Sequence, residues 1–130
     1  MFKITPIQNI EMHEKYARAC GTSLREGFFA YAMLDVDTGE LMGFSQFEIG
    51  EAGYISDILL RTGYEDYEAL FILAKATMNF IDTCGAHTCY ADPTTTGEKL
   101  LAAIGFKKQS DGKFFADMTG MFDGSHCSHT

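Results

Sequence analysis

One acidic residue stands inside an otherwise apolar stretch of this sequence. The run 54–60 reads Tyr-Ile-Ser-Asp-Ile-Leu-Leu, and Asp57 is its only charged member. A near-continuous apolar run of this length is typical of a central strand covered on both faces. An unpaired carboxylate is expensive to bury there, so Asp57 is a candidate for chemistry. The alternative is that Asp57 lies near a strand end and caps a neighbouring loop.

Three other ionisable residues suggest mainly structural roles. Glu48, on the preceding strand, is a weaker carboxylate candidate, since solvent-facing strand carboxylates are common. Asp92 stands before Pro93 and is expected to cap the turn and helix that follow. His13 lies on the first predicted helix, on a surface that we expect to face solvent.

Cysteines and histidines gather in two short segments. The first contains Cys84, His87 and Cys89, and the second, near the end, reads His126-Cys127-Ser-His129. Thiolate and imidazole groups are the ligands that Zn²⁺ prefers, but neither segment has the spacing of a zinc ribbon. The sequence therefore predicts no metal site, while a zinc site or a Cys84–Cys127 redox pair stays open as an alternative.

The composition limits the classes of protein and partner. The 130 residues are 46% hydrophobic and carry a net charge of −8, which suits one globular domain over 1–130 and disfavours nucleic acid and anionic membranes as partners. The N-terminus lacks the pattern of a signal peptide, so we expect a cytoplasmic protein. Its four cysteines are then expected to be free thiols.

The predicted elements alternate between strands and helices. Asn9 and Gly21 delimit a first helix, Gly85 ends a long one that begins near Asp66, and 95–98 (Thr-Thr-Gly-Glu) reads as a capping box. The fold class is α/β (α+β), a mixed sheet of about six or seven strands flanked by three or four helices. We expect strands at 1–7, 28–36, 41–49, 54–60, 87–92, 107–109 and 114–122, a connector or short helix at 22–27, and a polar tail at 123–130.

This order of elements resembles the GNAT superfamily of N-acetyltransferases. The likeness rests on the hairpin 36–44, on the strand-turn-helix unit 54–85, and on a helix that ends in Gly105-Phe106 before the last hairpin. In that family the fourth and fifth strands part, and the pantetheine arm of acetyl-CoA lies between them. The resemblance implies a co-substrate site for acetyl-CoA made by Ile58, Leu59 and Leu60 and by the turn Gly63, Tyr64, Glu65, Asp66 and Tyr67.

The sequence departs from the family at two positions. Glu65 and Tyr67 occupy places where the family has small residues that let the backbone approach the pyrophosphate. The acidic residues Glu65, Asp66 and Glu68 also put negative charge where phosphates bind. A tyrosine that protonates the leaving thiolate in many members is replaced by Leu101, and Tyr90 and Cys89 are the nearest substitutes.

The resemblance implies an N-acetyltransferase that acts by direct transfer on a small amine or a peptide amine. Asp57 would be the general base and Tyr90 the general acid, and a homodimer would suit the family. Two alternatives remain: a GNAT-fold binding or regulatory module that has lost catalysis, and a metal or redox site at the cysteines and histidines.

Overall fold

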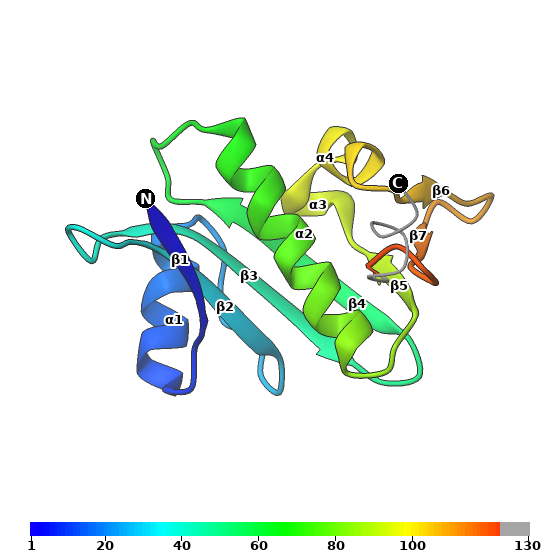
Figure 1. The fold of residues 1–130 in the computed structure, drawn as a ribbon, viewed down its shortest axis with the longest axis horizontal. Coiled ribbons are helices and arrows are strands. Elements are labelled where there is room, and N and C mark those ends of the chain that lie inside the picture. Colours follow the sequence, from blue (N-terminus) through cyan, green and yellow to red (C-terminus); the bar gives the residue numbers. More distant parts are fainter. Residues whose placement is uncertain (123–130) are drawn as a thin grey trace.

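Seven strands form one mixed sheet in the order β1-β2-β3-β4-β5-β7-β6 (Figure 1). The computed structural model describes residues 1–122 of the chain. The strands are β1 (Phe2–Pro6), β2 (Phe29–Asp35), β3 (Leu41–Ile49), β4 (Gly53–Leu60), β5 (Thr88–Ala91), β6 (Lys107–Lys108) and β7 (Phe114–Asp117). The prediction of a mixed sheet of six or seven strands is confirmed.

The sheet changes direction once. The strands β1 to β4 are paired antiparallel in chain order, β4 and β5 are parallel, and β5, β7 and β6 are again antiparallel. A parallel pair needs a crossover, and the long helix α2 (Tyr67–Thr83) supplies it. The point where β4 meets β5 is therefore the one place at which the sheet has two parallel neighbours within 1–122.

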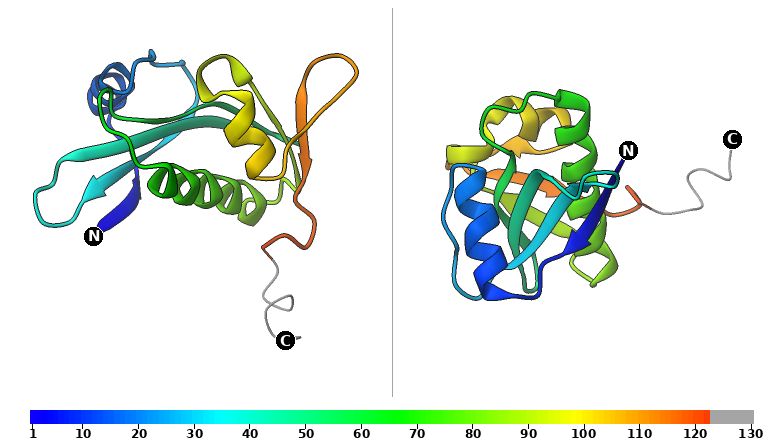
Figure 2. Two further views of the ribbon diagram at one scale, coloured as in Figure 1. Left: turned by 90° about the horizontal axis from the view of Figure 1, so that it is seen from above. Right: turned by 90° about the vertical axis from the view of Figure 1, so that its left-hand side faces the viewer.

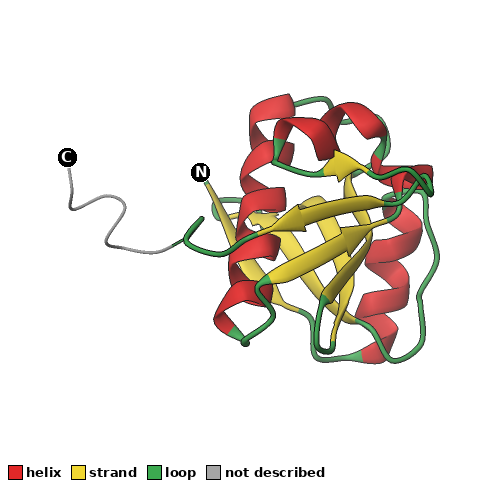
Figure 3. Ribbon diagram, turned by 90° about the vertical axis from the view of Figure 1, so that its right-hand side faces the viewer, coloured by secondary structure: helices red, strands yellow, loops and turns green. Residues whose placement is uncertain are grey.

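Helices cover both faces of the sheet (Figures 2 and 3). On one face Ala17 of α1 (Ile10–Ala19) and its C-cap, Cys20, are buried against small residues of β2 and Phe44 of β3. On the other face α2 and α4 (Glu98–Ala103) share a larger apolar cluster with β3, β4, β5 and β7. The sheet is thus buried on both sides at β4, as its apolar sequence predicted.

Caps fix where the first two helices begin. The side chain of Asn9 accepts the main-chain N–H groups of Glu11 and Met12, at 2.8 and 3.1 Å, and that of Asp66 accepts the N–H of Ala69 at 3.1 Å. Both starts agree with the sequence predictions. The segment 22–27 contains no helix and is a connector.

The predicted capping box at 95–98 is wrong. Asp92 caps a four-residue helix, α3 (Pro93–Thr96), by accepting the N–H of Thr94 at 2.9 Å, as expected for this residue. The chain then turns at Gly97 (φ 89°) into α4, which has no side-chain cap. The hydroxyl of Thr95 is therefore free to bond elsewhere, and it does so at the site described below.

A glycine allows α2 to pack closely on β4. A Cβ atom at Gly53 would lie 2.5 Å from Cγ2 of Ile81 and 3.2 Å from Sγ of Cys89.

No helix in the described range 1–122 is long and apolar enough to cross a membrane.

Candidate functional site

The strands β4 and β5 pair over only three residues and then part. The register joins Gly53–Ile55 to Cys89–Ala91, and the N–H of Asp92 makes the last bond across, to the carbonyl of Ile55 at 3.0 Å. Ser56 is an extra residue on β4, because Ile55 faces Phe47 of β3 while Asp57 faces Gln46. Such a β-bulge bends and twists its strand, and the two parallel strands separate at this point.

The short helix α3 lies beside the part of β4 that β5 leaves unpaired (Figure 1). The hydroxyl of Thr96 accepts the main-chain N–H of Ile58 at 3.1 Å. The hydroxyl of Thr95 lies 3.3 Å from the carbonyl of Ser56 and donates to the carboxylate of Asp57. Two successive threonines thus take the place of a strand partner.

Asp57 is fully buried and accepts hydrogen bonds from five groups. Its Oδ1 accepts the hydroxyls of Thr95 and Thr22, the latter at 3.0 Å. Its Oδ2 accepts Nε2 of Gln46 and Oγ of Ser56, both at 2.8 Å, and Nε of Arg25 at 3.4 Å. Burial alone would raise the pKa of the Asp57 carboxyl, but these hydrogen bonds outweigh it and lower the pKa below 3.8. The carboxylate is therefore a stable anion that joins β3, β4, α3 and the connector 22–27.

Gln46 extends this network to the first helix. Its amide nitrogen donates to Asp57 and to the carbonyl of Ser23, so its Oε1 is the acceptor for Nε2 of His13 at 2.8 Å. His13 is only 5% exposed and packs beside the ring of Phe44. The prediction that His13 faces solvent is wrong, because a polar partner inside the core was not visible from the helix pattern alone.

A hollow of about 380 Å³ opens where β4 leads into α2. We call it the α2 hollow. It is lined by Ile58, Leu59, Leu60, Tyr64, Glu65, Asp66, Tyr67, Leu70, Thr95 and Thr96. These include every residue that the sequence predicted for the co-substrate except Gly63, which lies in the turn (φ 88°) outside the lining.

The two ends of the α2 hollow differ in their fitness for acetyl-CoA. At the strand end, pairing of Phe44 with Leu59 directs the main-chain groups of Ile58 and Leu60 away from β3, which suits an amide-rich pantetheine arm. At the helix end, the Asp66 carboxylate already occupies the start of α2, where phosphate would otherwise bind. The residues present fit the pantetheine part, and they do not form a glycine-rich phosphate cradle.

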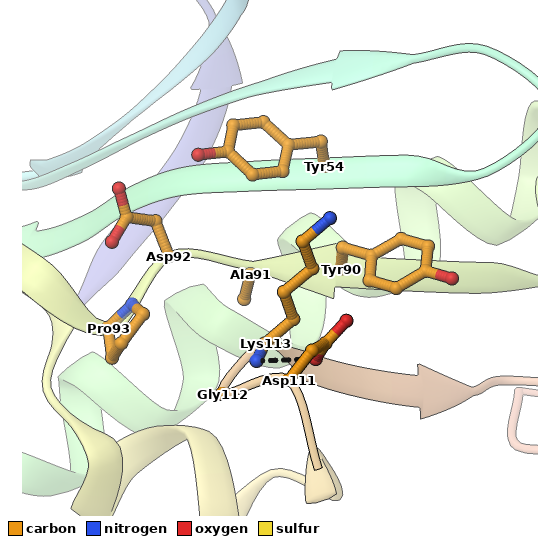
Figure 4. Close-up of a pocket in the computed structure, with 8 residues that line it drawn as sticks. All are labelled: Tyr54, Tyr90, Ala91, Asp92, Pro93, Asp111, Gly112 and Lys113. Carbon is orange, nitrogen blue, oxygen red and sulfur yellow. Dashed lines mark hydrogen bonds between the residues drawn. The ribbon is translucent and has the colours of Figure 1, made fainter. Parts of the chain in front are cut away.

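A second hollow, of about 460 Å³, lies on β5 (Figure 4). We call it the β5 hollow. Tyr90 is 40% exposed there and packs against the ring of Phe115, at 5.1 Å between centroids. Its lining residues are Tyr54, Tyr90, Ala91, Asp92, Pro93, Asp111, Gly112 and Lys113. The helix α3 stands between the hollows, since Pro93 lines the β5 hollow and Thr95 and Thr96 line the α2 hollow.

Tyr54 and Asp92 lie together in the β5 hollow, and we predicted a catalytic role for neither from the sequence. The Asp92 carboxylate points toward the Tyr54 hydroxyl (Figure 4). Burial and the nearby Asp92 raise the pKa of the Tyr54 phenol, while hydrogen bonds from Thr94 lower the pKa of Asp92. No sequence signal indicated this pair, because it depends on the parallel register of β4 and β5, which sets Tyr54 beside Tyr90.

The first cysteine and histidine segment does not converge on a metal. Within 1–122, no group of three His, Cys, Asp or Glu side chains is placed to hold an ion. His87 pairs instead with Asp82, Nδ1 to Oδ1 at 2.6 Å, and burial raises the pKa of the Cys89 thiol to about 12. His126, Cys127 and His129 lie outside the described residues. Glu48 is exposed on β3 and is in neither lining, although it pairs in register with Tyr54 of the β5 hollow.

Comparison with known proteins gives a structural answer only. No family model and no curated protein matches the sequence. The fold is similar to that of an IAA acetyltransferase from Bacillus cereus, with a TM-score of 0.70, 12% identity and coverage of 85% of this chain and 79% of the other. It is also similar to a GNAT family N-acetyltransferase from Escherichia coli solved in complex with CoA (TM-score 0.68, 14% identity, 90% and 81% covered). The ribosomal-protein-S18-alanine N-acetyltransferase of Escherichia coli gives a TM-score of 0.66 at 11% identity, with 88% and 91% covered. This chain has the GNAT fold.

Proposed function

We propose that the protein is an acyl-CoA-dependent N-acetyltransferase that transfers an acetyl group directly to a small amine or a peptide amine. One observation carries the proposal. The α2 hollow is lined by the diverging end of β4 and the first turn of α2, and the β5 hollow lies across α3 from it. Two hollows on the two sides of α3, at the parting of parallel strands, suit a protein that binds two substrates.

In this proposal β4 holds the pantetheine part of acetyl-CoA. The main-chain groups of Ile58 and Leu60 point away from β3 into the parting, and the side chains of 58–60 give the hollow an apolar wall. Acetyl-CoA supplies a thioester, which a neutral amine can attack. The N–H of Ile58 already donates a hydrogen bond to the hydroxyl of Thr96. This hydrogen bond must break before a ligand can bind the N–H.

Two cations beside the α2 hollow offset its acidic turn. The guanidinium of Arg61 lies 5.4 Å from the centre of the Tyr64 ring, and Nζ of Lys99 lies 5.8 Å from that of Tyr67. Both tyrosines line the hollow. We therefore assign the phosphates of the co-substrate to Arg61 and Lys99 rather than to main-chain N–H groups at the start of α2.

Asp57 is proposed to act through Thr95. The carboxylate is fully buried, but Thr95 lines the α2 hollow and its hydroxyl donates to the carboxylate. A proton leaving the acceptor amine can pass to Thr95 as Thr95 passes its own to Asp57. The lowered pKa of Asp57 makes it a weak base, so its first role in this proposal is to position Thr95 and Arg25. Tyr90, the acid suggested by the sequence, lines the β5 hollow and not the α2 hollow, so in this proposal it would have to reach the leaving thiolate past α3.

Thermal unfolding with acetyl-CoA tests the co-substrate site. Ligand at about 100 times its dissociation constant stabilises a native protein by about 2.7 kcal/mol, a shift of several degrees in Tm. We expect this shift in the wild type and its loss in Leu60→Trp, which fills the α2 hollow. Leu34→Trp changes another half-buried leucine, which lies on β2 and packs against the apolar cluster around Ala17 and Phe44. This control variant should still show the shift in Tm with acetyl-CoA. A wild type that does not respond contradicts the proposal.

The second candidate is a GNAT-fold binding module without catalysis. Asp66 at the start of α2 and Thr96 on the N–H of Ile58 favour it, because both occupy groups that a co-substrate would use. This candidate predicts no response to acetyl-CoA in the same experiment.

A further inference from the structure

Charges of both signs surround the β5 hollow. Asp92 and Asp111 line it together with Lys113. Arg25, which is not part of the lining, lowers the pKa values of Tyr54 and Asp92, and its partner Asp57 raises them. Glu48 faces Tyr54 across the β3–β4 register. Carboxylates therefore outnumber cations around the hollow, while charges of both signs are present. A ligand with one charge would therefore meet unfavourable groups as well as favourable ones.

Arg25 is anchored by one edge of its guanidinium. Its main-chain N–H donates to Oε1 of Gln46 at 3.2 Å, and its Nε donates to Asp57 at 3.4 Å. The side chain remains 42% exposed. Among the described residues its terminal Nη nitrogens make no hydrogen bond to protein, so a planar pair of donors is left for a ligand.

Lys113 contributes the second cation from the β6–β7 hairpin. Its side chain extends toward the space between the rings of Tyr54 and Tyr90 (Figure 4). Its main-chain N–H donates to Asp111 at 3.0 Å, which fixes the turn that presents it. The ion pairs found within residues 1–122 do not include Lys113.

We propose that the β5 hollow takes a zwitterion, a small molecule that carries both a primary ammonium group and a carboxylate. Asp92, with the Tyr54 hydroxyl beside it, receives the ammonium group. Arg25 and Lys113 receive the carboxylate, and the rings of Tyr54 and Tyr90 pack against the ligand's side chain. The acceptor is then an amino acid or an amino-acid-like molecule, with its amine held beside α3. The volume of about 460 Å³ lies in the range of small-molecule sites.

This inference rests on the proposed function for its chemistry, but the binding it requires can be measured alone. The probes are phenylalanine, phenethylamine, which lacks the carboxylate, and 3-phenylpropionate, which lacks the amine. Amide chemical shifts of uniformly ¹⁵N-labelled protein locate the site, and Gly112, which lines the β5 hollow, is the reporter. We expect phenylalanine to bind at least about tenfold more tightly than either single-charge probe. Each single-charge probe lacks one charge-assisted hydrogen bond and leaves a charged group of the protein without a partner.

Substitutions of Arg25 and Lys113 test the assignment of the carboxylate. Arg25→Gln removes the charge, and we expect this variant to bind phenylalanine no more tightly than phenethylamine. Arg25→Lys keeps the charge and should restore part of the preference for phenylalanine. Arg18→Gln is the matched control, because Arg18 pairs with Glu14 on the outer face of α1 and should leave binding unchanged. Equal affinity for phenylalanine and phenethylamine in the wild type overturns the inference. A preference that survives both Arg25→Gln and Lys113→Gln overturns it as well.

The same labelled sample separates this inference from the proposed function. Acetyl-CoA should shift the amide of Gly63, next to the α2 hollow, independently of Gly112. Phenylalanine binding without any response to acetyl-CoA would contradict the transferase while leaving the zwitterion site in place. A response to acetyl-CoA with no shift of Gly112 by any of the three probes would overturn the zwitterion site alone.

Discussion

The hydroxyl of Thr96 accepts the main-chain N–H of Ile58 at 3.1 Å, across the point where β4 and β5 part. In a continuous sheet a carbonyl of the neighbouring strand would meet this N–H group. Here a side chain from a four-residue helix does so, and it is 9% exposed. The protein thus satisfies, with its own threonine, a donor that our proposal gives to the pantetheine arm.

Thr96→Val should separate the two uses of this N–H group. Valine keeps the shape of threonine but cannot accept the hydrogen bond. We expect the free energy of unfolding to fall by about 1 kcal/mol, and acetyl-CoA to bind about fivefold more tightly, since it no longer displaces the hydroxyl. Calorimetric titration measures the affinity. Thr88→Val on β5 should change neither quantity, and unchanged or weaker binding by Thr96→Val would show that the ligand does not use Ile58.

Asp66→Asn should improve binding of acetyl-CoA. Asparagine is also a good helix cap, so α2 should keep its start while one negative charge leaves the turn. We expect tighter binding whose gain shrinks as salt is added, and no gain for acetyl-pantetheine, which lacks the nucleotide phosphates. Glu11→Gln removes a comparable acid from the first turn of α1 and serves as control. An equal gain for both ligands would place the phosphates elsewhere.

The fold followed from the sequence because its signals are local and periodic. Asn9 and Asp66 cap their helices as predicted, and β3 covers the predicted range 41–49. The capping box at 95–98 misled because its pattern is equally compatible with two short helices broken at Gly97. A glycine with positive φ decided between them, and the broken form turns the hydroxyl of Thr95 toward β4.

The partners of Asp57 could not be predicted, because they come from distant parts of the chain. Thr22, Arg25, Gln46 and Thr95 have no shared sequence pattern, and only the tertiary fold brings them to one carboxylate. The apolar run around Asp57 indicated that the residue mattered without indicating how. For the same reason, the burial of His13 depends on Gln46, a residue 33 positions away.

Asp57→Asn should destabilise the protein in addition to any effect on transfer. An asparagine amide would place a donor among groups that already donate, so we expect a loss of about 3 kcal/mol from the free energy of unfolding. Chemical denaturation measures this loss. Asp117→Asn changes an exposed carboxylate that accepts the N–H of Thr119, which asparagine can also accept, and its Tm should stay the same. A variant that is as stable as the wild type but inactive would favour the general base over the positioning role.

Asp57 also predicts the behaviour of the protein in acid. Its pKa is lower in the folded than in the unfolded chain, where it is near 3.8. A group of this kind contributes stability that is present above the unfolded pKa and is lost as the pH falls through the folded pKa. We expect the free energy of unfolding of the wild type to fall below about pH 4. Asp57→Asn should show a shallower fall over the same range, and parallel curves would contradict the assignment.

Gly53→Ala tests the contact between α2 and β4. The added Cβ would meet Ile81 at 2.5 Å, so the helix must shift, at a cost of about 1–3 kcal/mol. Gly50→Ala is the matched control, because a Cβ there has its nearest neighbour, the carbonyl oxygen of Ala52, at an ordinary 3.7 Å. Equal denaturation midpoints for the two variants would show that the helix adjusts without strain.

The carboxylate of Asp57 is shared by Arg25, to which we assign the carboxylate of a ligand in the β5 hollow, and Thr95, which lines the α2 hollow. A ligand that changes the hydrogen bond of either side chain to Asp57 therefore also changes the environment of the other side chain. Thermodynamic linkage makes such an effect reciprocal, so each ligand must change the dissociation constant of the other by the same factor. If both hollows are used, the order in which the two ligands are added will alter the path to the ternary complex but not its total binding free energy.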